Sequence, residues 1–285
     1  MEEEWDHLVV LDGCRYDYFS KMYGAYMEGR LEMGLSLGSN TVEWRDNSFP
    51  ECYGDVVYVS ANPYINSRVS VKGFKAWDHF HRVVDVWDWG WDAELGTVHP
   101  RKVNEAARIA LEEYPDKRLI IHYLQPHCPY VGLQPKGTGY PSQSPASSTV
   151  LDGTLSAQKL PTIRRRALGL TTSLARSTLL GRVRVVTEGH LWRLRESLGL
   201  PPETPMDAVR RTGGVAGLRE AYARNLELVL TYASELLRGL DGNVAVTADH
   251  GELLGESGRF SHGYGREESL LLEVPWFRPD RGSVF

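Results

Sequence analysis

Three segments of the sequence carry side chains that can bind metals or transfer protons, and each follows a short apolar run. The first is Asp12, directly after the run HLVVL. The second is HYLQPHCPY, at 122–130, and the third is DHGELLGESGRFSH, at 249–262. Open α/β sheets gather functional groups at the carboxyl ends of their strands. If the apolar runs are strands of one sheet, all three segments meet in a single site.

Asp249, His250 and Gly251 form the strongest of these elements. A carboxylate beside an imidazole offers hard and borderline metal ligands from one turn. Gly251 would let the backbone turn closely around an ion. The alternative is a polar surface turn without a ligand. His262 in the glycine-rich loop that follows, and Asp12 as a matching carboxylate, favour the metal site.

The segment DGCRYD, at 12–17, has two interpretations. Asp12 can ligate the same ion, or it can cap the N-terminus of the helix that follows. Arg15 and Asp17 are placed to form an ion pair that holds the loop.

Apolar runs and helical patterns predict the elements that carry these residues. Short runs rich in β-branched residues indicate buried strands, and amphipathic periodicity indicates helices. The expected strands are 7–12, 55–60, 83–87, 118–122 and 243–248, and the expected helices are 16–23, 104–114 and 217–240. Strands that alternate with helices and end in reactive residues are typical of an α/β fold.

Residues 135–214 interrupt this alternation. The stretch 135–156 is rich in Gly, Pro, Ser and Thr, which indicates a loop or lid. The residues after it are rich in Arg and Leu with helical periodicity, and the sheet pattern then resumes. We therefore expect one catalytic domain, 1–285, with a loop and helical insertion at 135–214 that packs outside the sheet and overhangs the site.

Composition narrows the class of protein. A formal net charge of -5 over 285 residues argues against a general nucleic-acid binder. Cys14, Cys52 and Cys128 are too few for a disulfide framework and lack CxxC spacing. The acidic N-terminus has no leader pattern, and no apolar run approaches the ~20 residues that span a bilayer. We expect a cytoplasmic protein, and composition says nothing of its oligomeric state.

The motifs LDGCRYD, PHCPY and TADHGE, with the later FSHG, resemble those of the alkaline phosphatase superfamily. The most similar branch is the sulfatase-like group, which includes phosphodiesterases and phosphoglycerol transferases. The order and spacing match over residues 7–134 and 215–277. The resemblance implies a three-layer α/β/α sandwich with a mixed, mostly parallel central sheet.

The resemblance also implies a divalent metal at the carboxyl ends of the strands. The matching ligands are Asp12, Asp249 and His250, together with a nucleophilic side chain. His127 and His262 match positions that, in the family, hold a second metal or bind the ester anion and the leaving group.

The nucleophile of the family, a Thr, Ser or modified Cys, lies in a short segment after the first strand and helix. That segment is GSNTVEW here, at 38–44. Thr41 is the expected nucleophile and a metal ligand, since a helix that starts after it would help to bind an anion; Ser39 is the alternative. Aligned on the Cys-x-Pro-x-Arg signature of sulfatases, the segment has Asn40 for the cysteine and Val42 for the proline. A formylglycine mechanism is therefore not expected.

One metal ion per chain is expected. Members with two metals supply a further Asp and His, often as Asp-x-x-x-His, whereas QPH at 125–127 offers no carboxylate here. Carboxylate and imidazole ligands favour Zn or Mn. His99, His122 and His190 are interpreted as structural or surface histidines, because a lone histidine more often satisfies a local hydrogen bond.

These residues predict a metal-dependent hydrolase or transferase that cleaves a phosphate or sulfate ester of a small molecule or glycan. Thr41 would form a covalent intermediate, and His127 or His262 would act at the leaving oxygen. A single metal favours a phosphate diester or a sulfate ester over a phosphate monoester, which carries more charge. The alternative is an inactive relative that binds an anionic or polysaccharide ligand. The atypical nucleophile segment favours that alternative, and the complete set of metal-competent residues opposes it.

Overall fold

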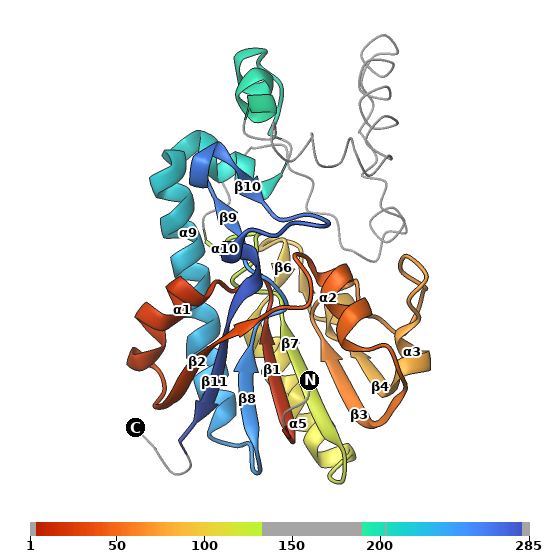
Figure 1. Cartoon of the computed structure of the whole chain (residues 1–285). Helices are drawn as coiled ribbons and strands as arrows, with labels where there is room; N and C mark the ends of the chain where they lie inside the picture. Colours follow the sequence, from red (N-terminus) through yellow and green to blue (C-terminus); the bar gives the residue numbers. More distant parts are fainter. Residues whose placement is uncertain (1–3, 133–189, 203, 281–285) are drawn as a thin grey trace.

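The computed structural model describes residues 4–132, 190–202 and 204–280 (Figure 1). The strands are β1 His7–Leu11, β2 Gly29–Leu35, β3 Tyr53–Ser60, β4 Phe80–Asp85, β5 Trp91–Asp92, β6 Thr97–Val98, β7 Arg118–Tyr123, β8 Val244–Thr247, β9 Leu253–Leu254, β10 Phe260–Ser261 and β11 Glu273–Pro279. The helices are α1 Tyr16–Met22, α2 Thr41–Ser48, α3 Ala76–His79, α4 Val86–Trp89, α5 Pro100–Glu113, α9 Pro205–Leu237 and α10 Ser269–Leu272. Short 3-10 turns lie at Tyr23–Ala25 (η1) and Glu256–Gly258 (η2).

Seven strands form the central sheet in the order β2-β11-β8-β1-β7-β3-β4. The five neighbours from β8 to β4 are parallel, and β11 runs antiparallel to both β2 and β8. In the register, Val10 of β1 is level with His122 of β7 and Thr247 of β8. The carboxyl ends of these three strands therefore lie at one edge. The sheet is mixed and mostly parallel, as predicted.

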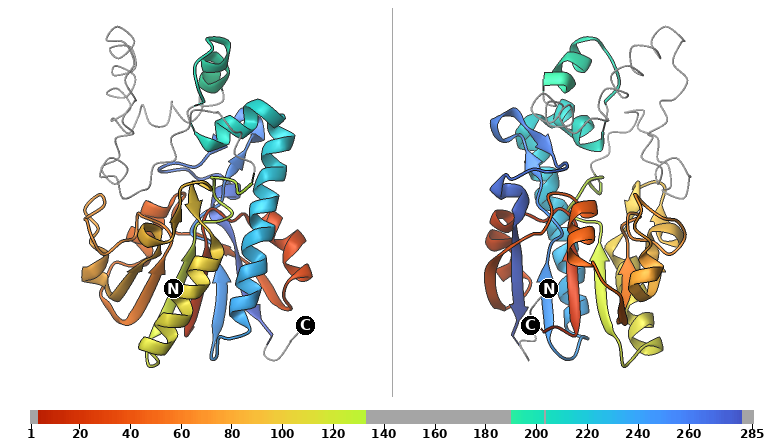
Figure 2. Two further views of the ribbon diagram at one scale, coloured as in Figure 1. Left: turned by 180° about the vertical axis from the view of Figure 1, so that it is seen from behind. Right: turned by 45° about the vertical axis from the view of Figure 1, so that its right-hand side comes forward.

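Helices cover both faces of the sheet, so the strands between them are apolar on both sides. Val9 and Ile121 point into one core with residues of α1, α5 and α9. Leu8 and Ile120 point into the opposite core with residues of α2 and α3. Figure 2, left, shows α5 and α9 side by side across one face. The fold is the predicted three-layer α/β/α sandwich.

One expected element was wrong, and two strands were missed. The strand expected at 83–87 ends at Asp85, and Val86 begins the short helix α4. The edge strands β2 and β11 were not predicted. Residues of β2 are largely exposed, and β11 contains Pro275 and Pro279, which are rare inside sheets because proline lacks an N–H donor.

Helix α9 bends at Gly214, where φ is 65° and ψ is -165°. This conformation is open to glycine because it has no Cβ. The arm after the bend corresponds to the helix expected at 217–240. The arm before it packs with Trp192, Tyr222 and Phe260 in a small separate core near the β9–β10 hairpin.

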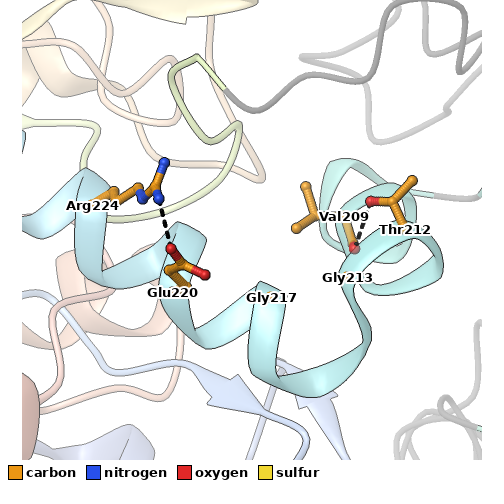
Figure 3. Close-up of a pocket in the computed structure, with 6 residues that line it drawn as sticks. All are labelled: Val209, Thr212, Gly213, Gly217, Glu220 and Arg224. Carbon is orange, nitrogen blue, oxygen red and sulfur yellow. Dashed lines mark hydrogen bonds and ion pairs between the residues drawn. The ribbon is translucent and has the colours of Figure 1, made fainter.

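A shallow cavity of about 150 Å³ lies at this bend. Figure 3 shows that residues from both arms line it, with Val209 and Thr212 before the bend and Glu220 and Arg224 after it. Glu220 and Arg224 pair with each other at 2.6 Å, so the charges on this wall are neutralised.

Most of the expected insertion at 135–214 lies outside the described residues. The described part includes a helical stretch at 190–197 and the first arm of α9. Among the described residues, no helix is both long enough and apolar enough to cross a lipid bilayer.

Candidate metal centre and active site

The four residues predicted as metal ligands converge at the carboxyl edge of the sheet. Thr41 Oγ1 lies 2.7 Å from Asp249 Oδ2 and 3.4 Å from His250 Nε2. His250 Nε2 lies 3.4 Å from Asp249 Oδ2 and 3.7 Å from Asp12 Oδ1. All four side chains are buried. Tetrahedral ligands at about 2.1 Å from an ion lie about 3.4 Å from one another, so the separations from His250 Nε2 suit such an ion, whereas the shorter contact of Thr41 with Asp249 is a hydrogen bond.

The backbone after β1 orients Asp249. Gly13 has a φ of 67°, and its N–H donates to Asp249 Oδ1 at 3.0 Å. The N–H of His250 donates to the same oxygen at 2.9 Å. Because Oδ1 is occupied by two backbone donors, Oδ2 is the oxygen that faces Thr41 and His250. Asp12 lies immediately before Gly13, so the turn positions both carboxylates at once.

Helix α2 begins at Thr41 and brings its hydroxyl to Asp249. The side chain of Asn40 caps the helix, accepting from the N–H groups of Val42 and Glu43 at 3.0 and 3.1 Å. Those two donors are therefore not available to an anion. The expectation that the start of this helix helps to bind an anion gains no support from them.

Ser39, the alternative nucleophile, has a different environment. Its Oγ lies 2.8 Å from Glu43 Oε2 and 2.6 Å from the carbonyl oxygen of Gly263, and it accepts from the N–H of Arg266 at 3.1 Å. These contacts tie the loop before α2 to the loop after His262. The partners of Ser39 include none of the four predicted ligands.

His250 is held in the tautomer that a metal ligand requires. Its Nδ1–H donates to the carbonyl oxygen of Gly251 at 2.7 Å, so the lone pair of Nε2 faces the carboxylates and Thr41. Burial lowers the pKa of His250 to about 4, which keeps the ring neutral near pH 7. Gly251 permits a close approach, but of another backbone segment: an added Cβ would lie 2.0 Å from the carbonyl oxygen of Leu270.

The two buried carboxylates repel each other. Burial and the charge of Asp249 raise the pKa of Asp12 well above its ordinary value. Burial works in the same direction on Asp249, but His250, His122 and its hydrogen bonds hold its pKa below the ordinary value. A divalent cation between the carboxylates would remove the repulsion. The chemistry of the donor set therefore fits a bound metal.

His127 and His262 lie beside this centre with a buried carboxylate between them, that of Glu252. Glu252 Oε1 lies 3.1 Å from His262 Nδ1, and Oε2 lies 3.6 Å from His127 Nε2. The ring of His262 lies 4.2 Å from that of His250 and 5.1 Å from that of His127, centroid to centroid. His127, Glu252 and His262 form a second group with metal-ligand spacing, beside the group of Asp12, Asp249 and His122.

Charges within this second group set its protonation. Burial opposes the charged form of His127, yet Cys128, Asp12 and Glu252 raise its pKa well above the ordinary value. Burial would raise the pKa of Glu252, but His262 and His127 hold it below the ordinary value. A cationic imidazole paired with an ionised carboxylate is the expected state.

Sequence reasoning gave Glu252 no role, although the motif TADHGE contains it. The expectation of a single ion depended on the lack of a carboxylate near His127 in the sequence. The loop between β8 and β9 supplies that carboxylate from a distant part of the chain. The available signal was the position of Glu252, three residues after Asp249 in the same loop.

Asn62 was also missed. Its Nδ2 donates to Asp12 Oδ2 at 2.6 Å and lies 3.3 Å from Thr41 Oγ1. Asn62 lies two residues after the end of β3, so the strand-end rule that selected Asp12 and Asp249 would have selected it as well.

The three histidines set aside as structural or surface residues differ in their positions. His99 caps α5, its Nδ1 accepting from the N–H of Arg101 at 3.2 Å. His190 is exposed. His122 is fully buried, and its Nε2 lies 4.0 Å from Asp12 Oδ2 and 3.9 Å from Asp249 Oδ2. His122 therefore belongs to the surroundings of the candidate centre.

The predicted ion pair of Arg15 and Asp17 is present, with Nε 2.8 Å from Oδ1. Arg15 also contacts Glu256 at 2.7 Å, which ties the loop after β1 to the loop after β9. All three cysteines are unpaired.

A cluster of two aspartates, a histidine and a threonine at the carboxyl edge of a mixed, mostly parallel sheet defines a class: an alkaline-phosphatase-like α/β protein with a candidate metal centre. The amino-acid sequence itself matches no protein-family profile and no curated protein. Solved structures match the fold.

The soluble domain of lipooligosaccharide phosphoethanolamine transferase A from Neisseria meningitidis matches with 15% identity and a TM-score of 0.53. The match covers 95% of this chain and 75% of that domain. The integral membrane form of the same transferase matches with 15% identity and a TM-score of 0.49, and this chain spans 47% of its length while 95% of this chain is covered. The phosphonate monoester hydrolase of Agrobacterium radiobacter matches with 13% identity and a TM-score of 0.48, over 97% of this chain and 68% of the hydrolase. The chain has the alkaline-phosphatase-like fold.

Proposed function

We propose that this protein is a metal-dependent enzyme that cleaves a phosphate or sulfate ester through a covalent intermediate on Thr41. The observation that carries the proposal is the position of the Thr41 hydroxyl, 2.7 Å from Asp249 Oδ2 and 3.4 Å from His250 Nε2 at the start of α2. A hydroxyl placed among carboxylate and imidazole groups is the arrangement of an activated nucleophile.

Asp12, Thr41, Asp249 and His250 would hold a divalent metal, with Zn or Mn preferred by this set of oxygen and nitrogen donors. Bound there, the ion would polarise an ester oxygen and favour loss of the Thr41 proton. One ion per chain remains our prediction for this centre. The group of His127, Glu252 and His262 is the place where a second ion would bind.

Thr41 Oγ1 forms a bond to phosphorus or sulfur while the bond to the leaving alcohol breaks. Water or an acceptor alcohol then displaces Thr41, giving hydrolysis or transfer respectively. The amide of Asn62, which bridges Asp12 and Thr41, holds the nucleophile in place and offers an N–H donor near the reacting oxygens.

His127 suits the role of proton donor to the leaving oxygen. Its Nδ1–H donates to the carbonyl oxygen of Cys128 at 2.6 Å, which fixes the ring, and its raised pKa keeps it protonated. A positioned acid of this kind typically contributes about 10²–10⁴-fold in rate. His262, whose Nδ1 faces Glu252, is placed to contact an ester oxygen with its other nitrogen.

The substrate class depends on the number of metal ions. A single ion supports a phosphate diester or a sulfate ester of a small molecule or glycan. Two ions would better neutralise a phosphate monoester. Phosphoethanolamine transfer and phosphonate monoester hydrolysis, the activities in the names of the structural neighbours, are both reactions at phosphorus that this centre would be suited to.

The test is a metal analysis of the purified full chain, followed by assays with chromogenic phosphate monoester, phosphate diester and sulfate ester. Each ester is offered with Zn or Mn, with and without glycerol as acceptor. We expect about one ion per chain and turnover of the diester or the sulfate ester. If the metal-loaded protein turns over no ester, the alternative of a binding module for an anionic or polysaccharide ligand becomes the better account.

A further inference from the structure

His122 has no role in the proposed reaction, yet it lies directly beside the proposed metal ligands. It is the fifth residue of β7, level with Val10 of β1 and with Ser60 of β3. Alternation along the strand turns His122 toward the face covered by α2, where the ring of Trp44 meets it edge-on at 5.9 Å. The imidazole is completely buried.

One nitrogen of His122 is engaged and the other faces carboxylates. Nδ1 lies 2.8 Å from the hydroxyl of Tyr58. Among the described residues, Nε2 has no hydrogen-bond partner, and it lies 3.9 Å from Asp249 Oδ2 and 4.0 Å from Asp12 Oδ2. A buried polar nitrogen without a hydrogen bond is costly, typically by about 1–3 kcal/mol, so its retention beside two carboxylates needs a reason.

The carboxylates determine which tautomer is favoured. With the proton on Nε2, a positive N–H dipole points at Asp12 and Asp249, and Nδ1 accepts a hydrogen bond from the hydroxyl of Tyr58. With the proton on Nδ1, the Nε2 lone pair would point at the same negative oxygens. The first arrangement is electrostatically favourable and the second is not.

Asp12, His122 and Asp249 have metal-ligand spacing, but His122 Nε2 lies farther from both carboxylates, at 4.0 and 3.9 Å, than His250 Nε2 does, at 3.7 and 3.4 Å. His250 Nε2 approaches Oδ1 of Asp12, whereas His122 Nε2 approaches Oδ2, the oxygen that Asn62 also holds. The two imidazoles thus approach different oxygens of Asp12, while at Asp249 both approach Oδ2.

We propose that Tyr58 and His122 form a positioning pair that holds the carboxylates of Asp12 and Asp249 at the separation a divalent metal requires. The Tyr58 hydroxyl fixes the ring so that Nε2–H faces both carboxylates and offsets their repulsion. Partners behind metal ligands orient them in this way, and their loss typically weakens metal affinity by about 10- to 100-fold. This inference rests on the proposed metal centre.

The test compares Zn²⁺ affinity in full-chain variants by competition with a chromophoric chelator. His122→Phe keeps an aromatic ring but has no N–H, and it should bind Zn²⁺ about 10- to 100-fold more weakly. His122→Gln keeps an N–H donor and should remain within several-fold of the wild type. If His122 had only a packing role, the aromatic Phe would replace it better than Gln. Tighter Zn²⁺ binding by His122→Phe than by His122→Gln therefore overturns the proposal.

Tyr58→Phe should weaken Zn²⁺ binding less than His122→Phe does. Its matched control is Tyr53→Phe, the same change at the other end of β3, where the hydroxyl contacts the carbonyl oxygen of Ser48 at 3.3 Å. The control should bind Zn²⁺ as the wild type does. Equal Zn²⁺ affinities for Tyr58→Phe and Tyr53→Phe would show that Tyr58 has no positioning role.

Two spectroscopic measurements complete the test. Nitrogen NMR of the metal-free protein should show the proton of His122 on Nε2, and a proton on Nδ1 overturns the proposal. The visible spectrum of the Co²⁺ form should be unchanged in His122→Gln. A changed spectrum would show the loss of an imidazole ligand, and His122 would then be a metal ligand, which overturns the proposal. If the wild type binds Zn²⁺ tightly and His122→Phe equals it, the positioning pair fails while the metal centre stands. If the wild type binds no metal, both fail.

Discussion

The hydroxyl of Thr41 lies 2.7 Å from Asp249 Oδ2, although 208 positions separate the two residues in the chain. The contact joins the start of α2 to the end of β8. It is reinforced by Ser36, whose hydroxyl donates to the carbonyl oxygen of Asp249, and by Asn62, which bridges Thr41 and Asp12. A loop that follows an edge strand is thereby held against the centre of the sheet, and the proposed nucleophile is placed before any substrate binds.

Asp249→Asn should lower metal affinity and activity together. The change keeps the shape of the side chain but removes the charge that faces Thr41 and His250. We expect a loss of at least about 100-fold in Zn²⁺ affinity, since a direct ligand matters at least as much as the groups behind it. The measurement is a chelator competition beside the ester assay. Asp241→Asn, at the exposed turn before β8, is the matched control and should change neither.

Thr41→Ala should abolish turnover while much of the metal affinity remains. The ion would keep Asp12, Asp249 and His250, and only the attacking oxygen would be lost. Loss of an oriented nucleophile should lower kcat by about 10³-fold or more, because water would have to replace it. Steady-state kinetics on the best ester, with metal content measured on the same sample, checks this. A variant that keeps full activity would indicate direct attack by water.

Ser39→Ala separates the two hydroxyl candidates. The Ser39 hydroxyl joins Glu43, Gly263 and Arg266, so its removal should reduce the free energy of unfolding by about 1 kcal/mol. Activity should fall only modestly. Urea unfolding and the ester assay together give the answer, and an inactive but fully stable Ser39→Ala protein would assign the nucleophile to Ser39.

Glu252→Gln should shift the pH dependence of the reaction. The carboxylate of Glu252 helps to raise the pKa of His127, so its loss should lower that pKa. If protonated His127 is the acid, activity is lost as pH rises through its pKa, and this alkaline limb should move to lower pH. The profile of kcat/KM against pH measures the shift. Glu267→Gln, at an exposed position nearby, should leave the profile unchanged, and an unmoved limb in Glu252→Gln would exclude His127 as the acid.

The contribution of His122 to the stability of the metal-free protein should fall as pH drops from about 6.5 to about 4. Burial lowers the pKa of His122 from 6.5 to about 4. The unfolded chain therefore takes up a proton near pH 6.5, while the native protein does so only near pH 4. The contribution of His122 is complete above pH 6.5 and declines within this window, by about 3 kcal/mol for such a shift.

His122→Phe isolates this contribution, because the variant has no group to titrate there. Its free energy of unfolding should change less than that of the wild type between pH 6.5 and pH 4.5. Urea unfolding with a chelator present, in steps across the window, measures the difference. The exposed His190→Gln change is the control and should follow the wild type. Identical pH dependence in all three proteins would contradict the prediction.

Local patterns in the sequence were enough to predict the class of fold and to select several residues of the candidate site. Runs such as HLVVL and RLIIH are local signals, because a strand buried between two helical layers must be apolar on both faces. The rule that functional groups follow such strands depends only on that local pattern, and it selected Asp12, His127 and Asp249. Helices that bury one face, such as α5, were likewise predicted from the spacing of their apolar residues.

How these residues meet depends on the tertiary structure. Whether His122 or Tyr123 turns toward the carboxylates depends on the face that each presents, and sequence cannot state this without the register of β7 against its neighbours. Loops that are distant in sequence bring Glu252 beside His127. They also determine that the hydroxyl of Thr41, and not that of Ser39, contacts Asp249. Such contacts arise only when the whole sheet has assembled, because each loop is positioned by strands from other parts of the chain.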